Sequence, residues 1–171
     1  MAHLHEGTFS SAGLRFGIAV SRFNEFITKP MFEGALNELR RAGVPETLIH
    51  VAWVPGAYEI PLACQTLVEQ QQCDALIAIG CIIRGDTSHY EHIAQSVANH
   101  LQTLVREKSV PIGFGVITVE NLEQAIDRAG GKHGNKGRDA ARSSLEMANL
   151  MRQMRAEGKP VSFHHFTDVE F

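Results

Sequence analysis

The sequence predicts a three-layer α/β/α sandwich built on a four-stranded parallel sheet. Four apolar segments have the length of strands, at residues 14–20, 49–54, 75–79 and 112–119. Segments with helical spacing of apolar residues separate them, and strands that are apolar throughout are typical of a parallel sheet covered on both faces. Because crossovers between parallel strands are right-handed, the connecting helices are expected on both faces of the sheet.

The helical segments follow in order between these strands. After a loop at 21–28, Pro30 suits the first turn of a helix that ends near Gly43 and Pro45. The second and third helices have apolar faces at three- and four-residue spacing, formed by Ile60, Leu62, Ala63, Leu67 and Val68 and by Ile93, Val97, Leu101 and Leu104. Two further helices are predicted at 122–128 and 138–156, separated by a glycine-rich bend.

Composition indicates one globular domain. The 171 residues are 44% hydrophobic, which suffices for a single core. We expect this domain to span residues 1–157, with an N-terminal arm at 1–13 and a C-terminal tail at 158–171 whose role is unassigned. The formal net charge is −3, so the chain has no overall positive potential that would attract nucleic acid or an anionic membrane surface.

The cysteines and the N-terminal segment indicate the cellular compartment in which the protein is expected. Cys64, Cys73 and Cys81 are odd in number and form no Cys-x-x-Cys pair, which fits reduced thiols better than disulfides or a metal site. The N-terminus has no signal-peptide pattern, and no apolar run approaches the length of a membrane span. We therefore expect a soluble, cytoplasmic protein.

Residues 80–89 form the most informative segment, because they lead from a buried strand into a helix predicted from Tyr90 onward. Free backbone N–H groups and the helix dipole at such a junction attract phosphate or carboxylate, and Gly85 and Thr87 suit that role. His89 lies within reach of a bound anion, and a helix N-terminus favours its neutral, base-competent form. The alternative is a capping or surface histidine. The first interpretation predicts proton transfer on a small phosphorylated molecule.

Two other predicted strand ends carry candidate side chains. Phe23 can stack on a planar heterocycle, and the alternative interpretation is that it packs with Phe26 at the strand–helix junction. Glu59 follows the turn at 54–58 and can accept hydrogen bonds from ring N–H groups or hydroxyls. Its alternative role is to complement the dipole of the following helix, and both roles are compatible.

Two motifs are set aside. His89 and His92 are three residues apart with no third ligand in view, so no metal is expected. The glycine-rich bend at 130–137 lacks the Gly-Lys-Ser/Thr ending and follows a helix, which excludes a nucleotide-binding P-loop. Contact of its lysines and Arg128 with an anion remains open.

Several motifs together resemble the lumazine synthase family. They are Arg-Phe-Asn at 22–24, Val-Pro-Gly-Ala-Tyr-Glu-Ile-Pro at 54–61, the segment 80–89, Glu-Gln-Ala-Ile-Asp-Arg-Ala-Gly at 123–130, Asn-Lys-Gly at 135–137 and Glu-Met-Ala-Asn at 146–149. The resemblance covers roughly residues 14–152 and implies a flavodoxin-like fold. It also implies condensation of 5-amino-6-(D-ribitylamino)uracil with 3,4-dihydroxy-2-butanone 4-phosphate to 6,7-dimethyl-8-ribityllumazine, phosphate and water. This reaction in riboflavin biosynthesis requires no metal and no cofactor.

The resemblance also implies roles for individual residues. His89 and Arg128 are the implied catalytic residues, for proton transfer and for pairing with the phosphate. The implied substrate-binding residues are Phe23, Asn24, Ala57, Tyr58, Glu59, Cys81, Ile82, Ile83, Gly85, Asp86, Thr87, Phe114 and Lys136. Among these, Phe23 stacks on the pyrimidine, Gly85, Asp86 and Thr87 line the phosphate site, and Phe114 closes the site of a neighbouring subunit. Like-charge repulsion requires that Asp86 bind phosphate through its backbone N–H.

The resemblance implies an assembly and leaves two alternatives. The family forms homopentamers, in many members assembled by twelve into an icosahedral shell, and riboflavin synthase is an implied partner. The first alternative is a non-catalytic shell protein that binds a lumazine or flavin. The second is an unrelated flavodoxin-like binding domain, which has no need of a subunit interface.

Overall fold

The computed structural model describes residues 2–11 and 13–157. This part of the chain forms a four-stranded sheet in the order β2-β1-β3-β4, with every neighbouring pair parallel. The predicted tail at 158–171 lies outside the described residues. The elements are β1 (Phe16–Ser21), α1 (Glu25–Arg41), β2 (Ile49–Val54), α2 (Ile60–Gln71), β3 (Ala75–Ile83), α3 (His89–Lys108), β4 (Ile112–Val119), α4 (Leu122–Arg128), β5 (Ala129–Gly131), β6 (Gly134–Asn135) and α5 (Lys136–Glu157), with 3₁₀ turns at Glu46–Leu48 and Ala57–Glu59.

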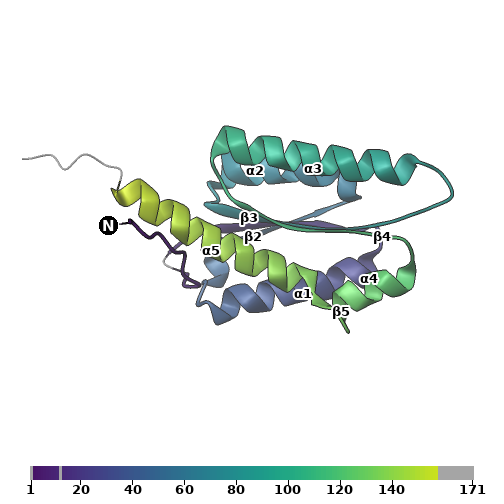
Figure 1. The fold of residues 1–171 in the computed structure, drawn as a ribbon, viewed down its shortest axis with the longest axis horizontal. Helices are drawn as coiled ribbons and strands as arrows, with labels where there is room; N and C mark the ends of the chain where they lie inside the picture. Colours follow the sequence, from purple (N-terminus) through teal and green to yellow (C-terminus); the bar gives the residue numbers. More distant parts are fainter. Residues whose placement is uncertain (1, 12, 158–171) are drawn as a thin grey trace, which may run out of the picture.

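The helices cover both faces of the sheet, as predicted. Helices α2 and α3 lie on one face, and α1, α4 and α5 lie on the other (Figure 1). Side chains of the strands alternate between two apolar clusters: Ile18 of β1 packs toward α1 and α5, whereas its neighbour Ala19 packs toward α2 and α3. This confirms the three-layer α/β/α sandwich with a flavodoxin-like arrangement.

The third strand is longer than the sequence suggested. The prediction ended it at Ile79 and assigned Gly80 to a loop, but β3 continues to Ile83. Residues 80–83 stay extended because β4 runs beside them, with register pairs up to Ile83↔Val119. The predicted loop at 80–89 is therefore wrong in its first four residues, and the true loop is 84–88.

The first helix also begins earlier than predicted. It starts at Glu25, so Pro30 lies inside the helix and the loop at 21–28 shrinks to three residues. The N–H groups of Ile27 and Thr28 donate to the carbonyl of Asn24, which starts the helix. Burial of Ile27, Thr28 and other residues on this face offsets the hydrogen bond that proline cannot donate.

The last helix and the bend before it differ in detail. The glycine-rich bend forms the small antiparallel hairpin β5–β6, and α5 begins at Lys136 where the prediction placed its start at 138. The Asn135 amide supports this start, because Nδ2 donates to the Pro30 carbonyl at 2.9 Å and Oδ1 accepts from the N–H of Arg138 at 3.0 Å.

The N-terminal arm has no helix or strand in its described residues 2–11, but it is held against the body of the domain. The Asn149 side chain donates to the carbonyls of Thr8 and Ser10 at 3.0 and 2.9 Å, and the Arg142 guanidinium lies 5.2 Å from the centroid of the Phe9 ring. Among the described residues, no helix is long and apolar enough to cross a membrane.

Candidate active site

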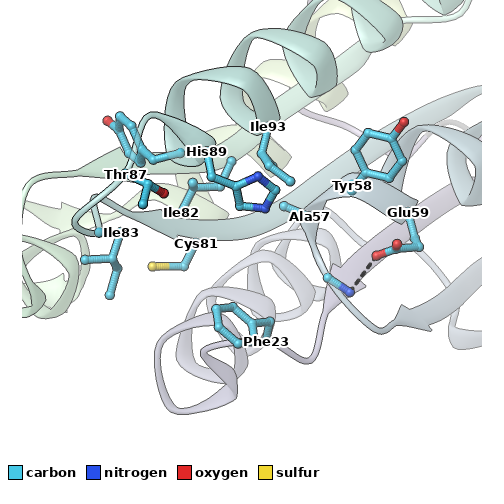
Figure 2. A pocket seen from close by; sticks show the side chains of 13 residues that line it. Phe23, Ala57, Tyr58, Glu59, Cys81, Ile82, Ile83, Thr87, His89 and Ile93 are labelled. Carbon is cyan, nitrogen blue, oxygen red and sulfur yellow. Dashed lines mark hydrogen bonds between the residues drawn. The ribbon is translucent and has the colours of Figure 1, made fainter.

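A cavity of about 400 Å³ lies where β1, β2 and β3 reach their carboxyl ends (Figure 2). This is the edge where parallel α/β sheets bind ligands, and the volume suits a small molecule. The cavity is lined by Phe23, Gly56, Ala57, Tyr58, Glu59, Cys81, Ile82, Ile83, Gly85, Thr87, His89, Tyr90 and Ile93.

The loop after β1 places Phe23 at the edge of the cavity. The N–H of Arg22 donates to the Val54 carbonyl at 2.8 Å, and the N–H of Phe23 donates to the Pro55 carbonyl at 3.0 Å. Phe23 is 70% exposed, and the nearby Phe26 is 58% exposed. Packing at the strand–helix junction therefore fails to explain either aromatic residue, and Phe23 lines the cavity, where an aromatic ring can stack on a ligand.

The turn after β2 contributes a carboxylate and an aromatic side chain. Glu59 Oε2 accepts a hydrogen bond from the N–H of Gly56 at 2.9 Å, which ties the carboxylate to the Pro-Gly turn. Ala57 beside it is buried, whereas Tyr58 is mostly exposed at the rim. The side chain of Glu59 thus has a structural partner while it borders the cavity.

The end of β3 supplies an apolar wall. Cys81 and Ile82 are buried, and Ile83 is half-buried. Burial raises the pKa of the Cys81 thiol to about 11, so this side chain is a neutral thiol at physiological pH.

The loop at 84–88 and the start of α3 bring the remaining groups. Gly85, Thr87 and His89 line the cavity, and His89 is the first residue of α3, a helix of 20 residues. In Figure 2, the imidazole of His89 and the ring of Phe23 lie on opposite sides of the cavity. Arg84 is directed elsewhere, because its Nη1 lies 3.2 Å from Glu120 Oε2.

Five residues expected in the site do not line this cavity. Asp86 is exposed in the loop at 84–88. Asn24 follows Phe23 in the loop after β1, and its Nδ2 donates to the Cys81 carbonyl at 3.0 Å. The other three are outside the cavity on later elements. Phe114 lies on β4, Arg128 is the last residue of α4 and Lys136 is the first residue of α5.

The partners of these three outlying residues are local. Arg128 Nη1 donates to the Gln124 carbonyl one turn back at 3.4 Å, and Lys136 Nζ lies 2.9 Å from Asp139 Oδ2. Phe114 is 52% exposed on β4, which is an edge strand. One chain therefore brings together the aromatic, carboxylate and histidine groups of the predicted site, but not its cations.

The prediction omitted three residues that line the cavity. Gly56 belongs to the turn motif at 54–59, and Tyr90 directly follows His89. Ile93 was assigned to the buried stripe of α3, yet it is four residues from His89 and therefore on the same helix face. That spacing was the available signal.

The arrangement suits proton-transfer chemistry on a planar polar molecule. It offers an aromatic face, an apolar wall, one carboxylate, one imidazole and the backbone of two tight turns. Within residues 2–11 and 13–157, no three or more His, Cys, Asp or Glu side chains are grouped so as to hold a metal ion.

Fold and cavity together define a parallel α/β protein with a small-molecule site at the carboxyl edge of its sheet. The model of the 6,7-dimethyl-8-ribityllumazine synthase family matches residues 13–152, which is most of the chain. The chain belongs to this family. It is therefore a transferase-class enzyme of riboflavin biosynthesis that acts on small molecules.

Proposed function

We propose that the cavity at the carboxyl edge is the active site in which 5-amino-6-(D-ribitylamino)uracil condenses with 3,4-dihydroxy-2-butanone 4-phosphate. The observation that carries the proposal is the convergence of Phe23, Glu59 and His89 from three separate chain segments on one cavity of about 400 Å³. The products are 6,7-dimethyl-8-ribityllumazine, phosphate and water.

The pyrimidine ring lies against Phe23 in this proposal. Phe23, 70% exposed at the cavity edge, is available for stacking, and Cys81, Ile82 and Ile83 provide an apolar wall for the ring. Glu59 keeps one oxygen on the Gly56 N–H and can accept from a substrate N–H or hydroxyl with its remaining acceptor capacity. Tyr58 borders the same end at the rim.

The phosphate lies at the loop before α3. Gly85 and Thr87 line the cavity there, and the N-terminus of a 20-residue helix favours an anion. Asp86 is exposed and outside the lining, which is compatible with a contribution from its backbone N–H alone. In this proposal the phosphorylated substrate lies within reach of His89.

His89 moves the protons that the condensation requires. The amine of the pyrimidine attacks the ketone carbon, and a C–N bond forms as the carbonyl oxygen takes up a proton and leaves as water. Phosphate then departs with the C–O electron pair after loss of a proton from the adjacent carbon, and the enol that remains becomes a ketone. The second amine attacks this ketone carbon, and its oxygen takes up protons and leaves as a second water as the ring closes. A single imidazole can donate and accept these protons in turn.

A second subunit completes the site in this proposal. Arg128, Lys136 and Phe114 lie outside the cavity of their own chain, so we assign them to the cavity of a neighbouring copy in a homopentamer. There, Arg128 pairs with the phosphate, Lys136 lies near the same end and Phe114 closes the opening. Assembly of twelve pentamers into a shell, a cytoplasmic location and contact with riboflavin synthase are further proposals.

Product formation is the direct test. The purified protein is mixed with both substrates in EDTA, and absorbance is followed in the lumazine band. A rising signal supports the proposed reaction without a dissociable metal. A folded, assembled protein that binds the pyrimidine but gives no signal would favour the non-catalytic alternative, which leaves His89 in the cavity without a chemical task.

A further inference from the structure

Asn24 connects two walls of the cavity. Its Nδ2 donates to the carbonyl of Cys81 at 3.0 Å, across 57 positions of sequence. The residue before it carries the aromatic ring at the cavity edge, and the carbonyl belongs to the apolar wall. The hydrogen bond therefore joins the loop of Phe23 to β3 at the level of the cavity.

The sheet explains why a side chain is used at this point. Pairing of β1 with β3 ends at Val20↔Ile79, whereas β3 continues to Ile83 beside β4. The edge of β3 that faces β1 is thus left without a neighbouring strand over residues 80–83. A buried strand carbonyl needs a donor, and the Asn24 amide supplies one.

The backbone of Asn24 is arranged for this contact. It adopts φ 59 and ψ 42, a left-handed conformation that asparagine tolerates better than most other residues. Its carbonyl accepts the N–H groups of Ile27 and Thr28, whereas its side chain makes no capping hydrogen bond to α1. The amide is therefore free to reach β3.

We propose that Asn24 is a positioning residue, which sets the distance between the Phe23 ring and the β3 wall and so determines how tightly the planar ring of the substrate is held. Arg22 and Phe23 anchor the loop to the end of β2, and Asn24 anchors it to β3. This inference rests on the proposed function, since it assumes a ring ligand stacked on Phe23. Asn24 then acts through Phe23 and not by direct contact with substrate, consistent with its absence from the lining.

A double-mutant cycle tests this role. Binding of 6,7-dimethyl-8-ribityllumazine is measured by equilibrium dialysis for the wild type, Asn24→Gly, Phe23→Ala and the double variant. Glycine keeps the left-handed backbone accessible and removes the side-chain amide. We expect Asn24→Gly to raise Kd about 3- to 10-fold in the wild-type background, as for loss of one hydrogen bond, and less than about twofold in the Phe23→Ala background.

Kinetics separate positioning from a general structural defect. Asn24→Gly should raise KM for the aminouracil by the same factor as Kd and leave kcat and KM for the phosphorylated substrate within about twofold. Asn24→Asp keeps the size of the side chain but places a carboxylate against the Cys81 carbonyl at neutral pH, so its defect should be at least as large. Gln72→Gly is the matched control, because Gln72 also has a left-handed backbone, φ 53, at the end of α2.

Three outcomes would overturn the inference: an unchanged Kd for Asn24→Gly, an equal rise in Kd in the Phe23→Ala background, or the same rise for Gln72→Gly. An additive cycle would mean direct contact with the ligand or a defect unrelated to Phe23. A wild type that binds the lumazine but does not synthesise it would contradict the proposed reaction alone. A non-additive cycle in that protein would still support the role of Asn24.

Discussion

At the scale of single residues, the proposed chemistry depends on His89. It is the first residue of α3 and lines the cavity, whereas His92, three positions further along the same helix, does not. The two histidines therefore form a matched pair for mutagenesis, with the same side chain on the same helix, one lining the cavity and the other outside its lining.

Replacement of His89 tests the proton-transfer role. Because general acid–base catalysis by one side chain typically contributes about 10²- to 10⁴-fold, we expect His89→Ala to lower kcat at least about 100-fold. Kd for 6,7-dimethyl-8-ribityllumazine should change little. His92→Ala should keep the wild-type kcat, and equal loss in both variants would contradict the assignment. Steady-state assays of lumazine formation give kcat for both variants, and equilibrium dialysis gives Kd.

The buried cysteines predict a dependence of stability on alkaline pH. Burial raises the pKa of Cys64 to about 12 and of Cys73 and Cys81 to about 11, from 9.0 in the reference thiol. Above pH 9 the unfolded chain loses these protons while the folded chain keeps them, so the free energy of unfolding should fall as pH rises from 9 toward 11. Urea denaturation between pH 8 and pH 10.5 measures it.

A matched variant identifies the source of this dependence. Cys64→Ala removes the most strongly shifted thiol, so its free energy of unfolding should fall less steeply over the same pH range. An unchanged slope would assign the alkaline loss of stability to other groups.

The three thiols should also resist alkylation by iodoacetamide in the folded protein at pH 8, because the thiolate is the reactive form.

At the scale of elements, the packing of the layer formed by α1 and α5 depends on how closely α5 approaches its neighbours. A Cβ at Gly137 would lie 2.0 Å from the Met31 carbonyl oxygen of α1, and a Cβ at Gly113 would lie 2.0 Å from the Ala140 carbonyl oxygen of α5. These two glycines allow α5 to pack directly against α1 and β4. Both contacts are with backbone, so neither can be relieved by moving a flexible side chain.

Substitution of either glycine should loosen this layer. We expect Gly113→Ala and Gly137→Ala each to lower the free energy of unfolding by about 1–3 kcal/mol, because the backbones must separate to admit a methyl group. Gly85→Ala is the control for stability, since nothing lies within 4 Å of a Cβ there. Thermal denaturation of the three variants compares them. Equal stability of Gly137→Ala and Gly85→Ala would contradict the close approach.

At the scale of the whole molecule, one chain holds only part of the proposed machinery. The cavity contains Phe23, Glu59 and His89, whereas Arg128 and Phe114 lie outside it. If a neighbouring subunit supplies Arg128, Arg128→Ala should raise KM for the phosphorylated substrate about 10- to 100-fold, as expected for loss of a charge-assisted hydrogen bond. Binding of the lumazine should change little, and Arg138→Ala provides the arginine control.

Mixing of two impaired variants, assayed at a concentration of the phosphorylated substrate well below the KM of Arg128→Ala, tests the shared site. His89→Ala and Arg128→Ala subunits are dissociated, combined in equal amounts and reassembled. A composite site then contains His89 from one subunit and Arg128 from its neighbour, so about a quarter of the sites should be intact and activity should return. If both residues act within one chain, no site in the mixture is intact. Absence of recovery from well-assembled mixtures would therefore contradict the shared site.

The sequence alone predicted the layers of the fold and most of the cavity. The apolar segments and helical spacings led to the parallel sandwich, and the motifs at 54–59 and 80–89 contained ten of the cavity residues; Phe23 came from the motif at 22–24. These features are local, because strand periodicity, helix periodicity and tight turns each depend on residues close together in the sequence. Parallel strands then place their carboxyl ends at one edge, so the motifs meet there.

The tertiary structure decided what depends on neighbouring segments. The local sequence predicts that Gly80 belongs to a loop, but parallel pairing with β4 extends β3 to Ile83. Pro30 predicts the first turn of a helix, but burial of residues before it against the core allows α1 to begin at Glu25. The hydrogen bond from Asn24 to Cys81 joins residues 57 positions apart, which no local pattern can reveal. Long-range pairing and burial outweigh local preference at these points, and there the tertiary structure shapes the site.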